Sequence, residues 1–256
     1  MAFSPDYRSY PQASAATTAA VLDAGLRAYM LRVYNWMSSG LLVTAAVAYG
    51  IANTDLINLF YPVVQTPFGT ARSATPLAMI AMFAPLAFVL VLSLGVNRLS
   101  TTTAQALFWA FCAAMGASLT NIFIIYTGES VVRVFFITAA TFGATSLYGY
   151  TTKADLSRMG SFMMMGLIGI IIAGLVNIFL QSSALQFAIS IIGVVVFVGL
   201  TAFDTQRIKA DFVEYAYAYG PQEAAKRSVY DALSLYLNFI NLFTLLLSLM
   251  GNRNSN

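Results

Sequence analysis

The sequence has no histidine, a single cysteine and few charged residues, and each shortage excludes a class of protein or site. Charged residues make up 9% of the chain, against about 25% in an ordinary soluble domain, so a soluble globular protein is excluded. Without histidine the chain lacks the commonest proton switch, so any response to pH must come from a carboxylate. Cys112 alone cannot form a disulfide, a zinc site or an iron–sulfur framework.

We expect neither enzymatic chemistry nor a resident cofactor from this sequence. No motif pairs a nucleophile with a base, and the serine–histidine chemistry of rhomboid-type proteases is excluded by the absence of histidine. The 11 methionines are interpreted as core and lipid-facing residues rather than as a copper path. The chain has no basic stripe with interleaved aromatic residues, so we expect no nucleic acid partner.

Long apolar runs dominate what is present, because 59% of the residues are hydrophobic. A helix needs about 20 apolar residues to cross a hydrocarbon core of about 30 Å. Runs of that length predict seven spans, at residues 33–53, 76–96, 104–126, 131–150, 161–180, 184–206 and 232–250. The expected fold is an all-α membrane protein, a seven-transmembrane-helix bundle over residues 29–251. Residues 1–28 are expected to form a partly disordered cytoplasmic tail, and residues 252–256 a short C-terminal tail.

The cations between the runs predict the orientation of the chain in the membrane. Ten of the 13 lysines and arginines fall on the side of the N-terminus, and the other three are Arg72, Arg133 and Arg253. This asymmetry predicts a cytoplasmic N-terminus and, with seven spans, a C-terminus outside. Compact loops favour a bacterial inner membrane. Within the bundle, Gly166, Gly169, Ala173 and Gly174 predict that the fifth span packs closely on a neighbour.

Asp204 is the most informative residue, because it is an acid near the end of an uncharged apolar run. A carboxylate there must be paired, hydrated or protonated, so it marks a candidate functional site. The topology places Arg98, Asp231 and Asn238 in the same cytoplasmic half of the bundle, and Arg98 is the expected partner of the acid. The alternative is an interfacial polar cap that only fixes the topology, with Arg98 extending to the headgroups.

Six patches in this sequence resemble the Bax inhibitor family of seven-helix membrane proteins. The resemblance covers about residues 28–251. The patches are Arg32-Val-Tyr-Asn-Trp-Met, Gly116-Ala-Ser-Leu-Thr with Ile122-Phe and Tyr126-Thr, Phe135-Phe-Ile-Thr-Ala-Ala-Thr-Phe-Gly143, Thr152-Lys-Ala-Asp-Leu-Ser157, Phe203-Asp-Thr-Gln206 and Leu235-Tyr-Leu-Asn-Phe-Ile-Asn-Leu-Phe243.

The resemblance implies a pH-sensitive calcium leak in which six helices surround a central seventh. In the family, one carboxylate on the sixth helix and one on the seventh share a hydrogen bond that gates the cytoplasmic end, and an arginine after the second helix pairs with the first. Asp204 matches the first carboxylate and Arg98 the arginine, but Asn238 stands where the second carboxylate is expected. Since an amide has no charge to lose, we expect gating by protonation of Asp204 alone, with Asp231 as a candidate second carboxylate.

Calcium is expected to meet Asp204 only weakly and transiently, since tight sites gather six to eight oxygens. The resemblance also implies a rival function without transport. Some bacterial relatives modulate a membrane AAA protease, and animal relatives suppress cell death. On that interpretation the chain is a regulatory membrane protein whose N-terminal tail and 207–228 connection contact a partner. The partners expected are therefore the lipid bilayer, calcium ions and protons, or a membrane AAA protease.

Overall fold

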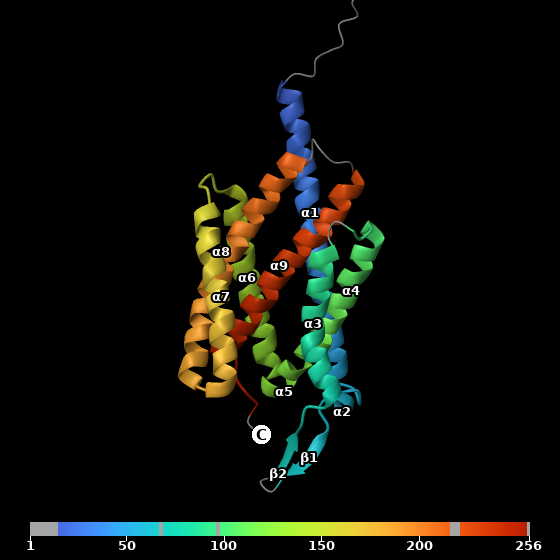
Figure 1. Cartoon of the computed structure of the whole chain (residues 1–256), viewed down its shortest axis with the longest axis vertical. Helices are drawn as coiled ribbons and strands as arrows, with labels where there is room; N and C mark the ends of the chain where they lie inside the picture. Colours follow the sequence, from blue (N-terminus) through green and yellow to red (C-terminus); the bar gives the residue numbers. More distant parts are fainter. Residues whose placement is uncertain (1–14, 67–68, 96–97, 216–220, 255–256) are drawn as a thin grey trace, which may run out of the picture.

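The computed structural model describes residues 15–66, 69–95, 98–215 and 221–254. Helices form almost all of it, and one small hairpin lies at one end (Figure 1). The elements are α1 (Ala15–Ala52), α2 (Ile57–Phe60), β1 (Val63–Thr66), β2 (Gly69–Arg72), α3 (Pro76–Gly95), α4 (Thr101–Ser118), the 3-10 turn η1 (Leu119–Asn121), α5 (Ile122–Ile125), α6 (Gly128–Thr151), α7 (Ser157–Leu180), α8 (Ser183–Tyr215) and α9 (Pro221–Met250).

Among the described residues, six helical stretches are long and apolar enough to cross a membrane. They are Pro76–Gly95, Thr101–Ile125, Gly128–Thr151, Ser157–Leu180, Ser183–Val213 and Glu223–Met250. Each of these six corresponds to one expected span. The remaining expected span, residues 33–53, lies within α1, which is 38 residues long but is not among the six. Its Tyr34, Asn35, Ser38 and Ser39 make this helix more polar than the others.

Three segments differ from the expected arrangement. The N-terminal tail is helical from Ala15 onward, and its residues 1–14 lie outside the described part of the chain. The connection 207–228 is largely helix, because α8 continues to Tyr215 and α9 begins at Pro221. The hydropathy of the sequence falls at Arg207, where the charged residues begin. No proline or glycine lies between Asp204 and Gly220, so nothing in the sequence ends the helix at the same point. The loop after α1 carries an antiparallel hairpin of β1 and β2, which was not expected.

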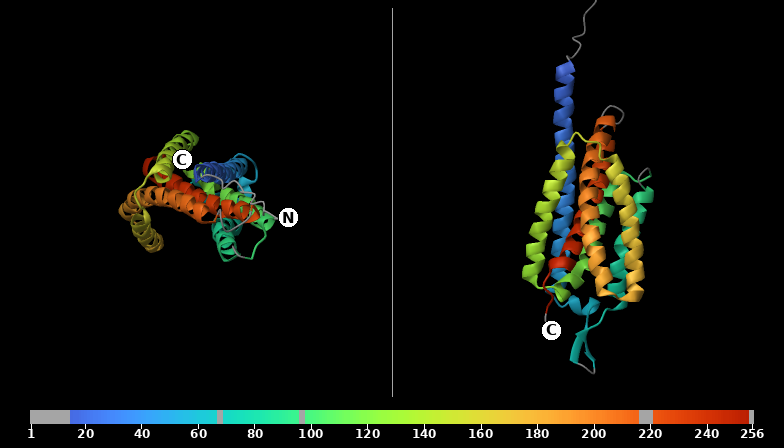
Figure 2. Two further views of the ribbon diagram at one scale, coloured as in Figure 1. Left: turned by 90° about the horizontal axis from the view of Figure 1, so that it is seen from above. Right: turned by 90° about the vertical axis from the view of Figure 1, so that its left-hand side faces the viewer.

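Helix α9 lies inside the bundle, in contact with helices on several sides. It packs against α8, α1, α6 and α4, and it crosses between the two halves of the molecule (Figures 1 and 2). In the 18-residue apolar stretch of α9 half of the residues are buried, whereas in the corresponding stretch of α7 none is. Helix α7 packs chiefly on α8 and turns its other faces outward. The first described turns of α1 project beyond the bundle at the end opposite the hairpin (Figure 1).

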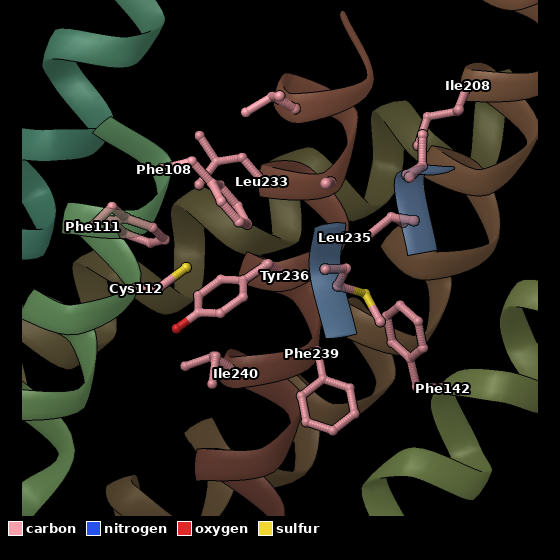
Figure 3. Packing of buried hydrophobic residues seen from close by; sticks show 14 of the residues in the cluster. Phe108, Phe111, Cys112, Phe142, Ile208, Leu233, Leu235, Tyr236, Phe239 and Ile240 are labelled. Atoms are coloured by element: carbon pink, nitrogen blue, oxygen red, sulfur yellow. The ribbon is translucent and has the colours of Figure 1, made fainter. Parts of the chain in front are cut away.

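Aromatic rings fill the core around α9 (Figure 3). The ring of Tyr236 is fully buried and lies 5.3 Å, centroid to centroid, from that of Phe111 on α4. Its hydroxyl shares a 2.6 Å hydrogen bond with the hydroxyl of Thr44, which is also 2.8 Å from the carbonyl oxygen of Cys112. One polar contact therefore joins α9, α1 and α4 inside an apolar layer.

Two glycines outside the expected set allow the closest approach of helices to α8. A Cβ on Gly149 of α6 would lie 2.2 Å from the carbonyl oxygen of Ala202, and one on Gly160 of α7 would lie 2.4 Å from the ring of Phe203. The expectation for α7 was correct for Gly166, whose added Cβ would meet Val196 at 2.9 Å. It was wrong for two others, Gly169 and Gly174, where an added Cβ would meet nothing within 4 Å; Gly169 lies on the exposed side of α7.

Candidate functional site

Asp204 lies on the buried face of α8, opposite α9. Its neighbours on that face, Thr201, Thr205 and Ile208, are fully buried, and Asp204 itself is 8% exposed. Across the interface Asn238 of α9 is 5% exposed. The spacing of these α8 residues by three and four positions places them on one side of the helix. An acid and an amide are therefore held in the same layer by two apolar helices.

Both carboxylate oxygens of Asp204 have a partner. The amide nitrogen Nδ2 of Asn238 donates a 2.7 Å hydrogen bond to Oδ2. The guanidinium nitrogen Nη2 of Arg207 lies 3.0 Å from Oδ1, one turn further along α8. The expected contact between Asn238 and Asp204 is present, and it joins two helices. Hydrogen bonds to a charged group typically contribute about 1.5–3 kcal/mol, so this contact is a substantial link between α8 and α9.

The arginine that pairs with Asp204 is Arg207, not Arg98. Arg98 follows α3, is exposed, and takes part in no ion pair with Asp204 among the described residues. Topology placed both arginines at the same end of the bundle, but depth alone does not determine which helix faces which. The separation of three residues between Asp204 and Arg207 was the available signal, because residues three apart are neighbours on a helix surface.

A second acid, Asp231, is bound by α1. The hydroxyl of Tyr29 donates a 2.5 Å hydrogen bond to Oδ2 of Asp231, and the Tyr29 ring lies 4.9 Å from that of Phe212. Arg207 acts electrostatically on Asp231 as well as on Asp204, so one guanidinium serves both acids. Arg227 and Asp211 also act on Asp231. The sequence identified Asp231 as a candidate, but it gave no sign of Tyr29.

A chain of hydroxyl groups lies directly beside Asp204. Oγ1 of Thr205 and Oγ of Ser146 are 2.9 Å apart, and Ser146 is also hydrogen-bonded to the hydroxyl of Tyr34. These three residues belong to α8, α6 and α1. The next residue, Gln206, accepts from the backbone of Leu156 at 2.9 Å and donates to the carbonyl of Ala154 at 2.8 Å. The part of α8 around Asp204 is thereby linked to α6 and to the connection between α6 and α7.

The chemistry that this arrangement allows is uptake and release of a proton. Protonation of Asp204 would remove the charge that both Asn238 and Arg207 bind. The amide of Asn238 cannot titrate, so this interhelical pair has one ionisable member. Among the residues that the structure describes, no group of three or more histidine, cysteine, aspartate or glutamate side chains is arranged to hold a metal ion.

Sequence comparisons link the chain to a known family. Residues 26–255 match the family described as "Inhibitor of apoptosis-promoting Bax1". An uncharacterised protein of Rickettsia prowazekii is 48% identical over 231 residues, which are 90% of this chain and 92% of that protein. Inner membrane protein YbhL of Escherichia coli is 46% identical over 230 residues, 90% of this chain and 94% of YbhL. An uncharacterised membrane protein of Streptococcus pyogenes is 33% identical over 232 residues, 90% of this chain and 94% of that protein.

Proposed function

The chain belongs to the Bax inhibitor family, and on that premise we propose that it is a bacterial inner-membrane calcium leak gated by protonation of Asp204. The observation that carries the proposal is the hydrogen bond of 2.7 Å by which Asn238 of α9 binds the buried carboxylate of α8. We name this contact, together with the Arg207 ion pair, the latch. The proposal assigns no catalytic residue and no resident cofactor to the chain.

The proposed topology has seven spans, with α1 as the first and α9 as the central one. Helix α1 is 38 residues long, which is ample for a crossing, and α9 contacts four other membrane helices. The excess of lysine and arginine at one end of the bundle supports a cytoplasmic N-terminus and an external C-terminus. On this orientation the latch lies in the cytoplasmic half of the membrane.

The gate follows from the charge of Asp204. Ionised, the acid attracts Arg207 and accepts a charge-assisted hydrogen bond from Asn238, so α8 and α9 are tied together. Protonated, it loses the ion pair and most of the strength of that bond. The link between the two helices weakens, and we expect leak to rise as the pH falls. Calcium is the permeant ion in this proposal and meets the oxygens of the site only in passing.

An apolar groove in the outer half of the bundle supports a gate at this depth. It has a volume of about 890 Å³ and is lined by residues of α1, α6 and α9, among them Phe239 and Ile240. These two residues follow Asn238 directly in the sequence. The groove therefore reaches the layer of Asn238, and its exposed residues Leu42 and Phe136 open it to the surface of the bundle.

The test is calcium flux into proteoliposomes between about pH 6 and about pH 8. Asp204→Asn mimics the neutral acid, so we expect a flux that is high at both values and no longer depends on pH. The matched control is Asp55→Asn, a change at an exposed acid between α1 and α2. Equal flux and an equal pH response in wild type and Asp204→Asn would remove Asp204 from gating.

A second candidate function is regulation of a membrane AAA protease or of a stress pathway, without transport. The observation that favours it is the projection of α1 beyond the bundle (Figure 1). Because Leu26 and Tyr29 are buried, a truncation should remove only residues 1–21. On the regulatory function this truncation abolishes control of the partner and leaves reconstituted flux unchanged. On the leak function the truncated protein and wild type behave alike in both assays.

A further inference from the structure

A cavity between α1 and α6 has a charged end and an apolar end. Its volume is about 450 Å³, within the range of about 300–1,000 Å³ that is usual for ligand pockets. At one end it is bordered by Arg27 of α1 and by Tyr150, the last residue but one of α6. Its other end reaches Met37 and Phe142. Arg27 and Met37 are ten positions apart on one helix, which corresponds to about 15 Å of depth.

One cation lines the charged end, and a second contacts Tyr150 there. Arg27 is exposed, and Nζ of Lys209 donates a 3.0 Å hydrogen bond to the carbonyl oxygen of Tyr150 and lies 5.1 Å from the centre of its ring. The ion pairs among the described residues give neither cation a carboxylate partner. The charged end of the cavity therefore has Arg27 on its rim and Lys209 bound to the rim residue Tyr150, and neither cation forms an ion pair among the described residues.

The walls of the cavity are apolar and open toward the bilayer. Leu31 of α1 is 54% exposed and Leu147 of α6 is 63% exposed. The floor is crossed by the hydrogen bond between Tyr34 and Ser146, which closes the cavity against the bundle interior. Since α6 is a membrane-length apolar helix, the open side faces hydrocarbon, and only the rim lies at the depth of headgroups.

We propose that this cavity is a binding site for an anionic phospholipid. The headgroup phosphate lies between Arg27 and Lys209, and one acyl chain runs down the wall past Leu31 and Leu147. Basic pockets between membrane helices are a general way of holding anionic headgroups. A soluble anion would use the two cations but would gain nothing from the apolar wall, so the arrangement fits a lipid better. The site is separate from the latch, and it stands even if the leak proposal fails.

The test is native mass spectrometry of the delipidated full-length protein titrated with phosphatidylglycerol or phosphatidylcholine. We expect phosphatidylglycerol to bind more tightly. Arg27→Gln and Lys209→Gln each remove one cation, and we expect each to weaken phosphatidylglycerol binding about fivefold. Gly143→Leu keeps both cations and fills the cavity, since Gly143 lines it and an added Cβ would meet nothing within 4 Å. We expect this variant to lose the phosphatidylglycerol adduct.

Two matched controls separate the site from general effects. Gly169→Leu makes the same substitution on the outward face of α7, where an added Cβ also meets nothing within 4 Å, and Arg72→Gln removes a cation at the other end of the molecule. Both should bind phosphatidylglycerol like wild type. Equal binding of the two lipids by wild type, or unchanged binding by Gly143→Leu, would overturn the proposal. Displacement of the lipid by millimolar inorganic phosphate, with Gly143→Leu unaffected, would reveal a soluble-anion site instead.

Discussion

The hydroxyl of Tyr29 is 2.5 Å from Oδ2 of Asp231, although 202 residues separate the two in the chain. The contact joins α1 to α9, and Asp231 lies in the field of the same Arg207 that pairs with Asp204. The buried Asp204 and the partly buried Asp231 are thus bound by different helices and both lie in the field of one cation. A change in the charge of one acid alters how strongly Arg207 is attracted to the other. The hydrogen bonds of Asp231 and Asp204 to their partners on other helices are therefore expected to be coupled.

The first prediction concerns that bond. Tyr29→Phe removes the donor and leaves a partly buried carboxylate without it, so we expect a loss of about 1.5–3 kcal/mol in the free energy of unfolding. Asp231→Asn should cost a similar amount. In the double variant the two losses should not add, with a coupling energy of about 0.5–3 kcal/mol. Unfolding by dodecyl sulfate in mixed micelles measures all four proteins. Strict additivity would show that the two side chains do not interact.

The second prediction concerns Asn238→Asp, which introduces a second carboxylate beside Asp204. Two acids in contact cannot both ionise at low cost, so the folded variant holds a proton that the unfolded chain releases. Its stability should therefore fall as the pH rises from about 5 to about 9, with a steeper slope than wild type. Thermal unfolding at several pH values gives the slope. The control is Asn53→Asp, at an exposed position directly after α1, and its slope should match that of wild type. If stability fell with pH in Asn238→Asp only as steeply as in wild type, the prediction would be contradicted.

The third prediction concerns the approach of α6 to α8. Gly149→Ala places a Cβ 2.2 Å from the backbone oxygen of Ala202, and backbone cannot yield as a flexible side chain does. We expect destabilisation by about 1–3 kcal/mol from overpacking. Gly169→Ala on α7 meets no atom within 4 Å and should be neutral or gain up to about 1 kcal/mol from helix propensity. Unfolding curves recorded side by side give the free energy of unfolding of each variant. Equal effects of the two substitutions would argue against the close approach of α6 to α8.

The fourth prediction concerns Asp155, which lies in the connection between α6 and α7. Hydrogen bonds from the side chain and the backbone N–H of Ser157 hold the pKa of its carboxyl below its usual value. A lowered pKa stabilises the folded state above the ordinary aspartate pKa, and this gain is lost as the pH falls through the folded value. Asp155→Ala should therefore be less stable than wild type near neutral pH, and the gap should close below about pH 4. A gap that stays constant with pH would assign the effect to the lost turn alone.

The sequence predicted most of the fold because length and hydropathy are sufficient to recognise a membrane helix. Six expected spans correspond to membrane-length apolar helices. Helix α1 is less apolar, and the ends of α8 and α9 carry charges, so hydropathy alone misjudged where these helices begin and end. The hairpin of β1 and β2 was missed because strands of four residues leave almost no periodic signal.

Part of the candidate site could be predicted from the sequence, and the errors in the rest have related causes. Depth along a helix can be read from residue counting, which placed Asp204 and Asn238 in the same half of the bundle, and the family resemblance then implied that they meet. Rotation about the helix axis cannot be read in this way, because lipid-facing and core-facing residues are both apolar. Arg98 was therefore assigned in place of Arg207. Tyr29 was missed for a related reason, since a tyrosine near the membrane surface is ordinarily an interfacial anchor.

Helix α9 comes after the other membrane-length helices in this sequence, and half of the residues in its 18-residue apolar stretch are buried. It also carries Asp231 and Asn238, which gain nothing from contact with lipid tails. Its insertion therefore depends on surfaces that α1, α4, α6 and α8 already present, and those surfaces stay uncovered until α9 has been synthesised. A nascent chain stopped before residue 221 would display them to the quality-control machinery of the membrane. The 30 residues of α9 therefore cover the surfaces by which an incomplete copy would be recognised.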